Sequence, residues 1–349
     1  MAHVATVTID ATHVTATLTD FPVFVDLADL DATVDFWDTV ANNGGDIRVY
    51  KDDGSTELAR EVVACLTASN TGELWFLADS ISSSADTVFH IYADGSSSEP
   101  ASDATYGSEA VWGNYDVVSH DGGTTDSSGN SYVTATGVGA ATGKVGADAG
   151  DYASTDYSTI NNAVGSNLGD CTVSFWLKTS QTSEGDPIYG RNTGNNQISA
   201  MQYNRSGTSK SIRLFWRDID GNRIDAIETT PTANWNNNAW HLHQHAIEGT
   251  TNTWGLYLDG AAETPSYSTT TTPDNWGAQN SMMIGRRSDV AQDYLSGDYD
   301  EIRIRTSVIT AAWAAAEYTN QNAPTTFYTA TGGSTPPATA GFSQAVVIM

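Results

Sequence analysis

Basic residues are scarce in this sequence of 349 amino acids. It has 42 acidic against 15 basic residues, a formal net charge of −27 and a pI near 4.2. Nucleic acids and anionic lipid surfaces bind clustered Lys and Arg, so the composition argues against both as partners. An acidic surface with few lysines is typical of proteins that work in very high salt, where self-repulsion is screened. We therefore expect a halophilic source, with an ordinary acidic secreted protein as the alternative.

Cysteines and long apolar runs are also rare. The two cysteines, Cys65 and Cys171, exclude a disulfide framework and a CxxC metal site. We expect two buried free thiols, with a single bridge between domains as the alternative. No run approaches the roughly 18 apolar residues of a membrane span. The N-terminal segment lacks the basic and apolar regions of a signal peptide. We expect a protein that is made in the cytoplasm and does not insert into membranes.

Helical periodicity is almost absent, whereas strand signals occur along the whole chain. Short runs rich in Val, Ile, Thr and aromatic residues, such as ELWFLAD and SIRLFWRD, are bounded by Gly, Asp, Asn and Ser turns. This pattern predicts an all-β protein made of two antiparallel β-sandwiches, with one C-terminal helix capped by Thr310. The expected divisions are an N-terminal sandwich at 1–95, a linker at 96–110, a second domain at 111–331, and a linker with an apolar tail at 332–349.

An ordered set of motifs identifies the second domain more closely. DSSGN (126–130) and TGKVG (142–146) are followed by DCTVSFWLKT, NNNAWHLHQHAIEGTTNTWGLYLDG, SMMIGRR and GDYDEIRI. In this order they resemble the laminin-G-like branch of the concanavalin A-like lectin/glucanase superfamily. The N-terminal segments LTDFPVFVDL and GGDIRVYKDDGSTELAREV resemble a β-sandwich module of unknown function that precedes such domains in archaeal and bacterial surface proteins. The resemblance implies a curved jelly roll with an adhesive, lectin-like role.

A cluster of three carboxylates, Asp298, Asp300 and Glu301, raises the question of glycoside hydrolysis. Hydrolases that this region resembles carry an ExDxE run, whereas the sequence here is SGDYDEI. Tyr299 and Arg303 stand where a second glutamate would have to be, so the glutamate that such chemistry uses as its acid is missing. We therefore expect a non-enzymatic protein, and a glycan-active hydrolase is the disfavoured alternative.

Strand alternation divides the same cluster into two faces. In DEIRIR, Asp300 shares a face with two isoleucines, which predicts that it points toward the core. Glu301, Arg303 and Arg305 are then expected to form a solvated ladder on the opposite face. The resemblance implies a calcium ion near the edge of the sandwich, for which hard oxygen ligands are suited.

The expected calcium ligands are Asp300 together with Asp126 and Asn130 of DSSGN. The alternative is that Asp300 binds backbone amides and that DSSGN is only a turn.

Other side chains are candidates for ligand binding. Trp216, Trp235 and Trp276 could stack on sugar rings, although a sandwich core also uses such rings. His241, His243 and His245 alternate along one strand. Their spacing of nearly 7 Å and the absence of a nearby acid or cysteine favour a structural role over a zinc site.

The apolar C-terminal segment FSQAVVIM suits strand addition to the sheet edge of a partner. Its expected partner-binding residues are Phe342, Val346, Val347 and Ile348. Adhesive-type domains without an export signal favour a virion component that is exposed outside only after cell lysis. We therefore expect a capsid turret, decoration or tail-fibre-like protein of a virus of halophilic archaea. Its expected partners are itself, other virion proteins and a glycan of the host surface. A cellular haloarchaeal adhesin is the alternative.

Overall fold

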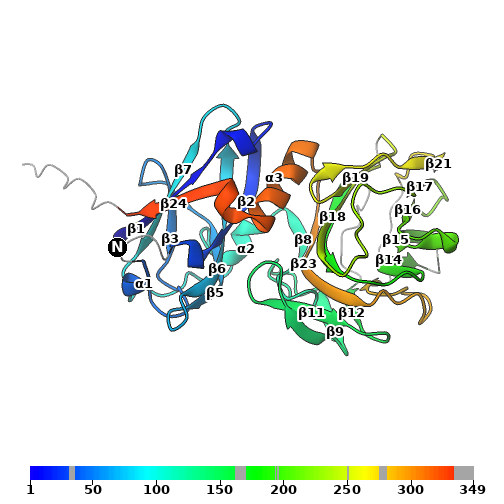
Figure 1. Cartoon of the computed structure of the whole chain (residues 1–349), viewed down its shortest axis with the longest axis horizontal. Helices are drawn as coiled ribbons and strands as arrows, with labels where there is room; N and C mark the ends of the chain where they lie inside the picture. Colours follow the sequence, from blue (N-terminus) through cyan, green and yellow to red (C-terminus); the bar gives the residue numbers. More distant parts are fainter. Residues whose placement is uncertain are drawn as a thin grey trace, which may run out of the picture.

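The computed structural model describes residues 1–30, 36–161, 170–192, 194, 196–249, 251–274 and 281–333. Within these ranges the chain forms four antiparallel sheets in two side-by-side β-sandwich domains (Figure 1). The two-sandwich architecture predicted from the sequence is thereby confirmed. No helix in the described part is long and apolar enough to cross a membrane.

The first domain has a five-stranded and a three-stranded sheet. The order in the larger sheet is β24 (Tyr328–Gly332), β1 (Ala2–Ile9), β7 (Thr87–Ala93), β3 (Arg48–Lys51) and β4 (Glu57–Leu58). The order in the smaller sheet is β2 (Leu18–Asp26), β6 (Thr71–Ile81) and β5 (Arg60–Leu66). Short helical turns are η1 (Ala11–His13), η2 (Leu27–Leu30) and α1 (Phe36–Thr39).

The second domain has two eight-stranded sheets. The sheet that faces the first domain runs β10 (Gly139–Thr142), β11 (Asp148–Tyr152), β23 (Gly297–Arg305), β13 (Asp170–Lys178), β18 (Trp240–Glu248), β19 (Thr253–Leu258) and β20 (Ala261–Ala262), with β8 (Tyr115–Ser119) paired to β23. The outer sheet runs β21 (Ser266–Thr270), β17 (Arg223–Glu228), β16 (Ile212–Arg217), β15 (Gln197–Tyr203), β14 (Gly185–Asn192), β22 (Ser281–Ile284), β12 (Tyr157–Asn161) and β9 (Val133–Thr136). The turn η3 (Arg205–Gly207) follows β15.

The C-terminal part of the chain crosses back to the first domain. The expected helix is α3 (Ala311–Asn322), and the Thr310 hydroxyl accepts a hydrogen bond from Trp313 N at its first turn. It is followed by α4 (Pro324–Phe327) and then by β24, which pairs with β1. The second-domain boundary expected at residue 331 is therefore wrong, because the last strand completes a sheet of the first domain.

The segment expected to be a linker, 96–110, is packed rather than extended. Arg48 donates to the Ser98 carbonyl oxygen at 2.8 Å, and Arg60 forms an ion pair with Glu99. The segment ends in α2 (Ser108–Val111), which contacts β5 and β6. These contacts hold the junction of the two domains.

Alternation along β16 fixes the two faces of the outer sheet. Ile212, Leu214 and Trp216 are fully buried in the core between the two sheets of the second domain. The residues between them point to the other side of the sheet, away from that core. This outer face includes Phe215 and its neighbours Arg213 and Arg217, and it lies at the end of the molecule farthest from the first domain (Figure 1).

Candidate functional site

The expected calcium ligands Asp126 and Asn130 hydrogen-bond to the backbone. Asp126 Oδ1 accepts from Val118 N at 3.2 Å and Asp126 Oδ2 accepts from Tyr132 N at 2.8 Å. Asn130 donates its side-chain amide to the Asp116 carbonyl oxygen at 3.1 Å. These contacts organise the loop after β8 without requiring a metal ion. They agree with the alternative interpretation, in which DSSGN is only a turn. A calcium ion at these residues stays a prediction.

Asp300 has a similar arrangement, but its orientation was predicted wrongly. Its Oδ2 accepts from Lys144 N at 2.7 Å and from Val145 N at 2.8 Å, at the junction of the domains. Glu301 has φ of 50°, and the pairing of β23 with β13 shifts register between Ser174 and Trp176. Such an extra residue breaks the regular alternation of a strand. Asp300 therefore does not share the core-facing side of Ile302.

Two members of the charged ladder expected on β23 are buried. Glu301 and Arg303 are each only 1% exposed, because the first domain covers this face of the sheet. The Arg303 guanidinium lies 4.1 Å from the centroid of the Trp75 ring and 4.9 Å from that of Trp112. Arg305 lies 3.8 Å from the Trp313 ring. This half of the strand is therefore part of an interface between domains.

Two of the three tryptophans expected to bind sugar are core residues. Trp216 and Trp235 are both 0% exposed, so the prediction that they contact a ligand is wrong for both. Trp276 and the tail residues Phe342, Val346, Val347 and Ile348 lie outside the described residues. The cysteines are free and buried, as expected.

The histidine strand has the structural role favoured by its spacing. His243 and His245 are both fully buried, and the Tyr203 hydroxyl lies between them at 2.8 Å from His243 Nδ1 and 3.1 Å from His245 Nε2. Burial lowers the pKa of His243 well below its usual value and the pKa of His245 to about 3. Both rings are therefore neutral parts of the core.

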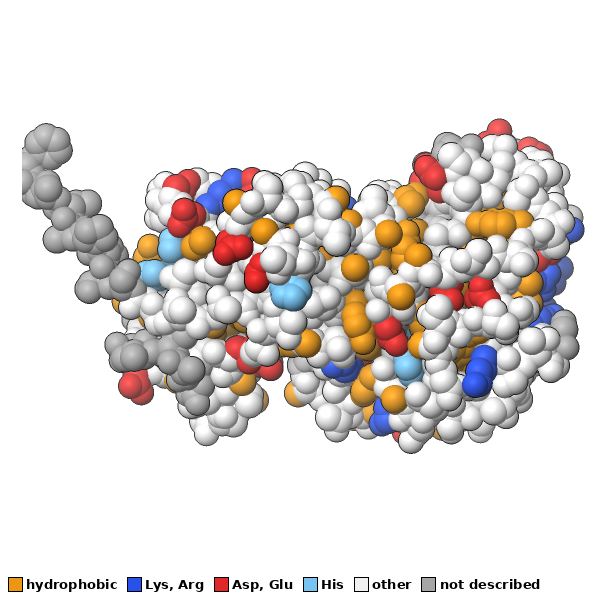
Figure 2. Space-filling model, turned by 45° about the horizontal axis from the view of Figure 1, so that its top comes forward, with side chains coloured by type: hydrophobic (Ala, Val, Ile, Leu, Met, Phe, Trp, Pro, Cys, Tyr) orange, Lys and Arg blue, Asp and Glu red, His pale blue; other side chains and the backbone are white. Residues whose placement is uncertain are grey.

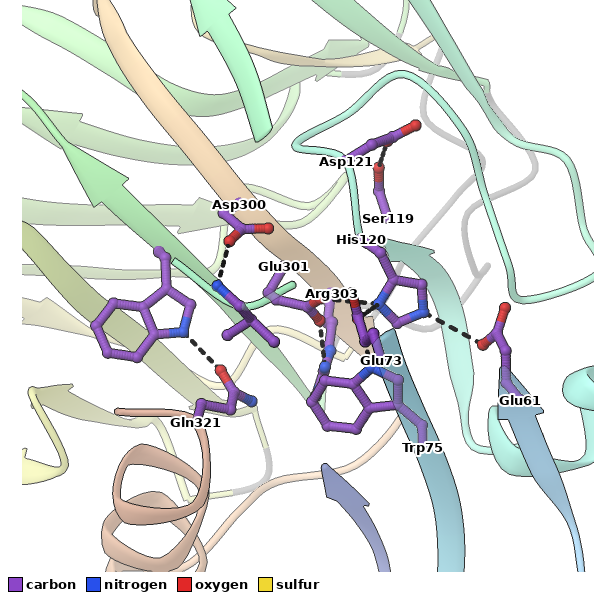
Figure 3. A network of polar contacts seen from close by, with 12 residues as sticks. Glu61, Glu73, Trp75, Ser119, His120, Asp121, Asp300, Glu301, Arg303 and Gln321 are labelled. Atoms are coloured by element: carbon purple, nitrogen blue, oxygen red, sulfur yellow. Dashed lines mark hydrogen bonds and ion pairs between the residues drawn. The ribbon is translucent and has the colours of Figure 1, made fainter. Parts of the chain in front are cut away.

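A buried polar cluster joins the two domains (Figure 3). Within the described residues, one group of three acid, cysteine or histidine side chains places its ligand atoms within 4.8 Å of one another, namely Glu73, His120 and Glu301. His120 Nδ1 lies 2.8 Å from Glu301 Oε1 and 3.5 Å from Glu73 Oε1. Its other nitrogen, Nε2, lies 3.2 Å from Glu61 Oε2. This junction cluster (Glu61, Glu73, His120 and Glu301) could hold a metal ion.

The protonation of the junction cluster follows from burial and charge. Burial, followed by the charge of Glu301, raises the pKa of Glu73 to about 8. Burial opposes the charged form of His120, but Glu301 and Glu61 together raise its pKa well above the usual value. For Glu301, burial is opposed by His120 and Arg303, which lower the pKa of its carboxyl. At neutral pH the cluster therefore holds charged His120 beside ionised Glu61 and Glu301.

The outer sheet of the second domain carries a second candidate site, a hollow of about 310 Å³. We call it the arginine hollow, because five of the chain's 15 basic residues line it, namely Arg191, Arg205, Arg213, Arg217 and Arg287. Lys and Arg side chains are seen along the corresponding end of the second domain in Figure 2. In a chain of net charge −27 this concentration of basic residues stands apart from the rest of the composition.

Strand register explains the shape of the arginine hollow. Ala200 of β15 pairs with Tyr189 of β14 on one side and with Phe215 of β16 on the other. Two strand spacings separate these aromatic residues by about 10 Å, and the small alanine between them forms the floor. In the next row, Arg191 pairs with Ile198, Ile198 with Arg217, and Arg217 with Arg223. An apolar floor is thereby flanked by aromatic rings and a row of guanidinium groups.

The arginines of this face differ in their charge partners. Arg191 lies 2.7 Å from Asp289, and Arg213 lies 3.0 Å from Asp225. For Arg217 and Arg223 no carboxylate lies within 4.0 Å among the residues that the structure describes. Burial, followed by the neighbouring charges of Arg191 and Arg223, lowers the pKa of Arg217. An anion bound beside Arg217 would relieve this repulsion between like charges.

The sequence itself carries a signal for this face. In SIRLFWRD, the residues facing away from Ile212, Leu214 and Trp216 are Arg213, Phe215 and Arg217. Guanidinium carbon atoms of Arg213, Arg217 and Arg223 lie 5.0–5.6 Å from the centroid of the Phe215 ring. Alternation alone would have shown the basic face, but it could not have shown which neighbouring strands complete the hollow.

Fold and surface together define the second domain as a two-sheet antiparallel jelly roll of lectin type. Residues 150–315 match the Laminin_G_3 family model, which describes the concanavalin A-like lectin/glucanases superfamily. This part of the chain is therefore similar to domains of the concanavalin A-like lectin/glucanase superfamily. Among curated proteins, no sequence match was found.

Several solved structures resemble part of the chain. The botulinum neurotoxin serotype D ligand binding domain in complex with N-acetylneuraminic acid is 14% identical, with a TM-score of 0.47, over 61% of this chain and 53% of that chain. The botulinum neurotoxin serotype D binding domain is 15% identical, with a TM-score of 0.46, over 60% and 52%. Domain 4 of AbnA, a GH43 extracellular arabinanase from Geobacillus stearothermophilus, in complex with arabinotriose, is 17% identical, with a TM-score of 0.43, over 57% and 98%. The match spans about half the length of the toxin domains.

Proposed function

We propose that the protein is a non-enzymatic, lectin-like surface protein whose arginine hollow binds an acidic glycan. The observation that carries this proposal is the hollow itself, in which five arginines and two aromatic rings surround an alanine floor on the free face of a lectin-type sheet. The rest of the chain is strongly acidic. A basic hollow on such a protein selects an anionic ligand over a neutral one.

Each part of the hollow has a chemical counterpart in an acidic sugar. A guanidinium group can donate two parallel hydrogen bonds to a carboxylate or sulfate. Arg217 is the best candidate, because within the described residues its Nε donates to the Asn196 carbonyl oxygen at 2.8 Å and no carboxylate pairs with it. Tyr189 and Phe215 offer ring faces or edges to the apolar side of a pyranose. Together these groups would recognise both the charge and the ring.

The lining of the hollow argues against hydrolysis. Glycosidases use a pair of carboxyl groups flanking the bond that is cleaved. Among the described residues that line the hollow there is no Asp or Glu. Asp225 and Asp289, which lie nearby, are engaged with Arg213 and Arg191. The site therefore supports binding without cleavage.

The proposal is tested by titrating the full chain with a tetramer of galacturonic acid and with the carboxyl-reduced, neutral form of the same tetramer. We expect the acidic tetramer to bind at least about tenfold more tightly, which corresponds to one charge-assisted hydrogen-bonded pair of about 1.4 kcal/mol. Equal affinity for both tetramers, or no binding of either, would contradict the proposal.

The wider role proposed for this binding is attachment of a virus of halophilic archaea to the glycans of its host, with the protein at the virion surface. The acidic composition supports a high-salt setting, and the lectin-type domain supports a surface role. Mass spectrometry of purified virions should detect the protein. Its absence from virions, together with its presence in a haloarchaeal cell envelope, would favour a cellular adhesin instead.

A further inference from the structure

The junction cluster has the composition of a metal site assembled from both domains. Glu73 comes from β6 of the first domain, whereas His120 follows β8 and Glu301 lies on β23 of the second. The three side chains are 4%, 6% and 1% exposed. Segments almost 230 positions apart in the chain are thus brought together with their ligand atoms within 4.8 Å of one another. An imidazole nitrogen and two carboxylate oxygens are donors that suit Zn²⁺.

Each potential ligand is also held by a further partner. Glu61 Oε2 lies 3.2 Å from His120 Nε2, so a carboxylate orients the ring through the nitrogen that faces away from Glu73 and Glu301. Trp75 Nε1 donates to Glu73 Oε1 at 2.7 Å. Arg303 donates to Glu301 Oε2, which leaves the Oε1 atom of Glu301 facing His120. Metal-binding histidines are commonly oriented by a carboxylate or carbonyl in this way.

Buried carboxyl groups outnumber the cationic side chains around the cluster. Five carboxyl groups lie there, those of Glu61, Glu73, Asp300, Glu301 and Glu317, and two cationic side chains accompany them, His120 and Arg303. Asp300 Oδ1 is also buried without a hydrogen-bond partner. A divalent cation at the cluster would compensate carboxylates that are costly to bury unpaired.

A cavity adjoins the cluster on one side. Glu73 also lines a cavity of about 340 Å³ between the domains, together with Asp26, Lys144 and Gly146. A side chain at position 146 would collide with Glu73 Oε2, so Gly146 packs directly against this carboxylate. Water or a further ligand of an ion could occupy this cavity, and the ion could enter through it.

We infer that Glu73, His120 and Glu301 form a Zn²⁺ site that joins the two domains. This inference is independent of glycan binding in the arginine hollow. Glu73 and His120 belong neither to the predicted calcium ligands nor to the carboxylates that were considered for hydrolysis. The ion would link a first-domain strand to two second-domain segments.

The test is a titration of the chelator-treated chain with ZnCl₂ alone. Calorimetry measures the binding, and thermal unfolding measures its effect on stability. We expect one equivalent to bind and to raise the unfolding temperature, because an ion that binds only the folded state stabilises it. Glu73→Gln, which keeps the shape of the side chain, should weaken binding at least tenfold. Glu61→Gln removes only the orienting carboxylate and should weaken binding about 10- to 100-fold.

A matched control addresses adventitious binding at the surface. His3 and His90 have ring centroids 4.7 Å apart on the first domain and could bind zinc weakly. His90→Gln should leave unchanged the one equivalent of zinc that binds at the junction cluster. Visible absorption of the Co²⁺-loaded wild-type chain provides a readout that does not depend on the folding of a variant. We expect an absorption band that disappears when Zn²⁺ is added. Zinc binding that His90→Gln abolishes, or that Glu73→Gln leaves unchanged, would overturn the inference.

Discussion

At the scale of single residues, the same side-chain types have opposite roles on the two faces of one sheet. Trp216 fills the core of the second domain, whereas its neighbours Phe215 and Arg217 line the arginine hollow. Buried histidines are likewise part of the packing, because Tyr203 supplies a hydroxyl between His243 and His245. The identity of a residue therefore says less about its role than the side of the strand on which it lies.

The buried histidines predict how stability depends on pH. The pKa of His245 is lowered to about 3, so the folded state keeps the ring neutral where the unfolded state binds a proton. The stability that this difference contributes is fully present above about pH 6.5 and is lost as the pH falls below it. Between about pH 6.5 and pH 5, His245 alone should cost about 2 kcal/mol of the free energy of unfolding.

Urea unfolding at pH 7.5 and pH 5 measures this loss, with His245→Phe as the comparison. Phenylalanine keeps an aromatic ring in the core but cannot bind a proton. We expect the variant to lose about 2 kcal/mol less than the wild type over this interval. An identical loss in both proteins would show that His245 does not titrate as its burial requires.

At the scale of elements, α3 holds the two domains together through hydrogen bonds to both. Asn320 on α3 donates to the Phe24 carbonyl oxygen at 2.9 Å and accepts from Phe24 N at 2.8 Å, so its side chain pairs with the edge of β2. Glu317 accepts from Gln244 at 2.7 Å, and Gln321 accepts from Trp176 at 2.6 Å on the second domain. One helix thus binds strands of both sandwiches through buried amide and carboxylate groups.

Replacing Asn320 by alanine should therefore be costly. The change leaves a buried N–H and a buried C=O of Phe24 without this partner, and each such group costs about 1–3 kcal/mol. We expect the free energy of unfolding to fall by about 3 kcal/mol. Asn322→Ala makes the same chemical change at an exposed position of the same helix and should stay within about 0.5 kcal/mol of the wild type. Equal effects of both substitutions would contradict this role.

The elements also show where prediction from the sequence reached its limit. Strand runs, the capped helix and the buried role of the histidines follow from local pattern, and the structure has all of them. The register shift at Glu301 and the burial of Arg303 do not follow, because alternation assumes a regular strand and cannot show which domain covers a polar face. The arginine hollow needs three strands in register, together with Arg205 and Arg287 from outside them, which local pattern does not supply.

At the scale of the whole molecule, the two domains present the arginine hollow at a free end. The inner sheet of the second domain is covered by the first domain, while its outer sheet faces away (Figure 1). The acidic remainder of the chain would repel an anionic ligand at low ionic strength. At molar salt the Debye length is only about 3 Å, so recognition would depend on direct contacts in the hollow. The proposed high-salt setting and the proposed ligand are thus compatible.

The most direct test of this account is the affinity of three proteins for the galacturonic acid tetramer at about 2 M KCl: the wild type, Arg217→Gln and Lys51→Gln. Both variants lose one positive charge, but Lys51 pairs with Asp79 on the first domain, far from the hollow in sequence and in fold. We predict that Arg217→Gln weakens binding about tenfold, whereas Lys51→Gln leaves it unchanged. Equal affinities for all three proteins, or equal losses in both variants, would contradict the assignment of the arginine hollow as the glycan site.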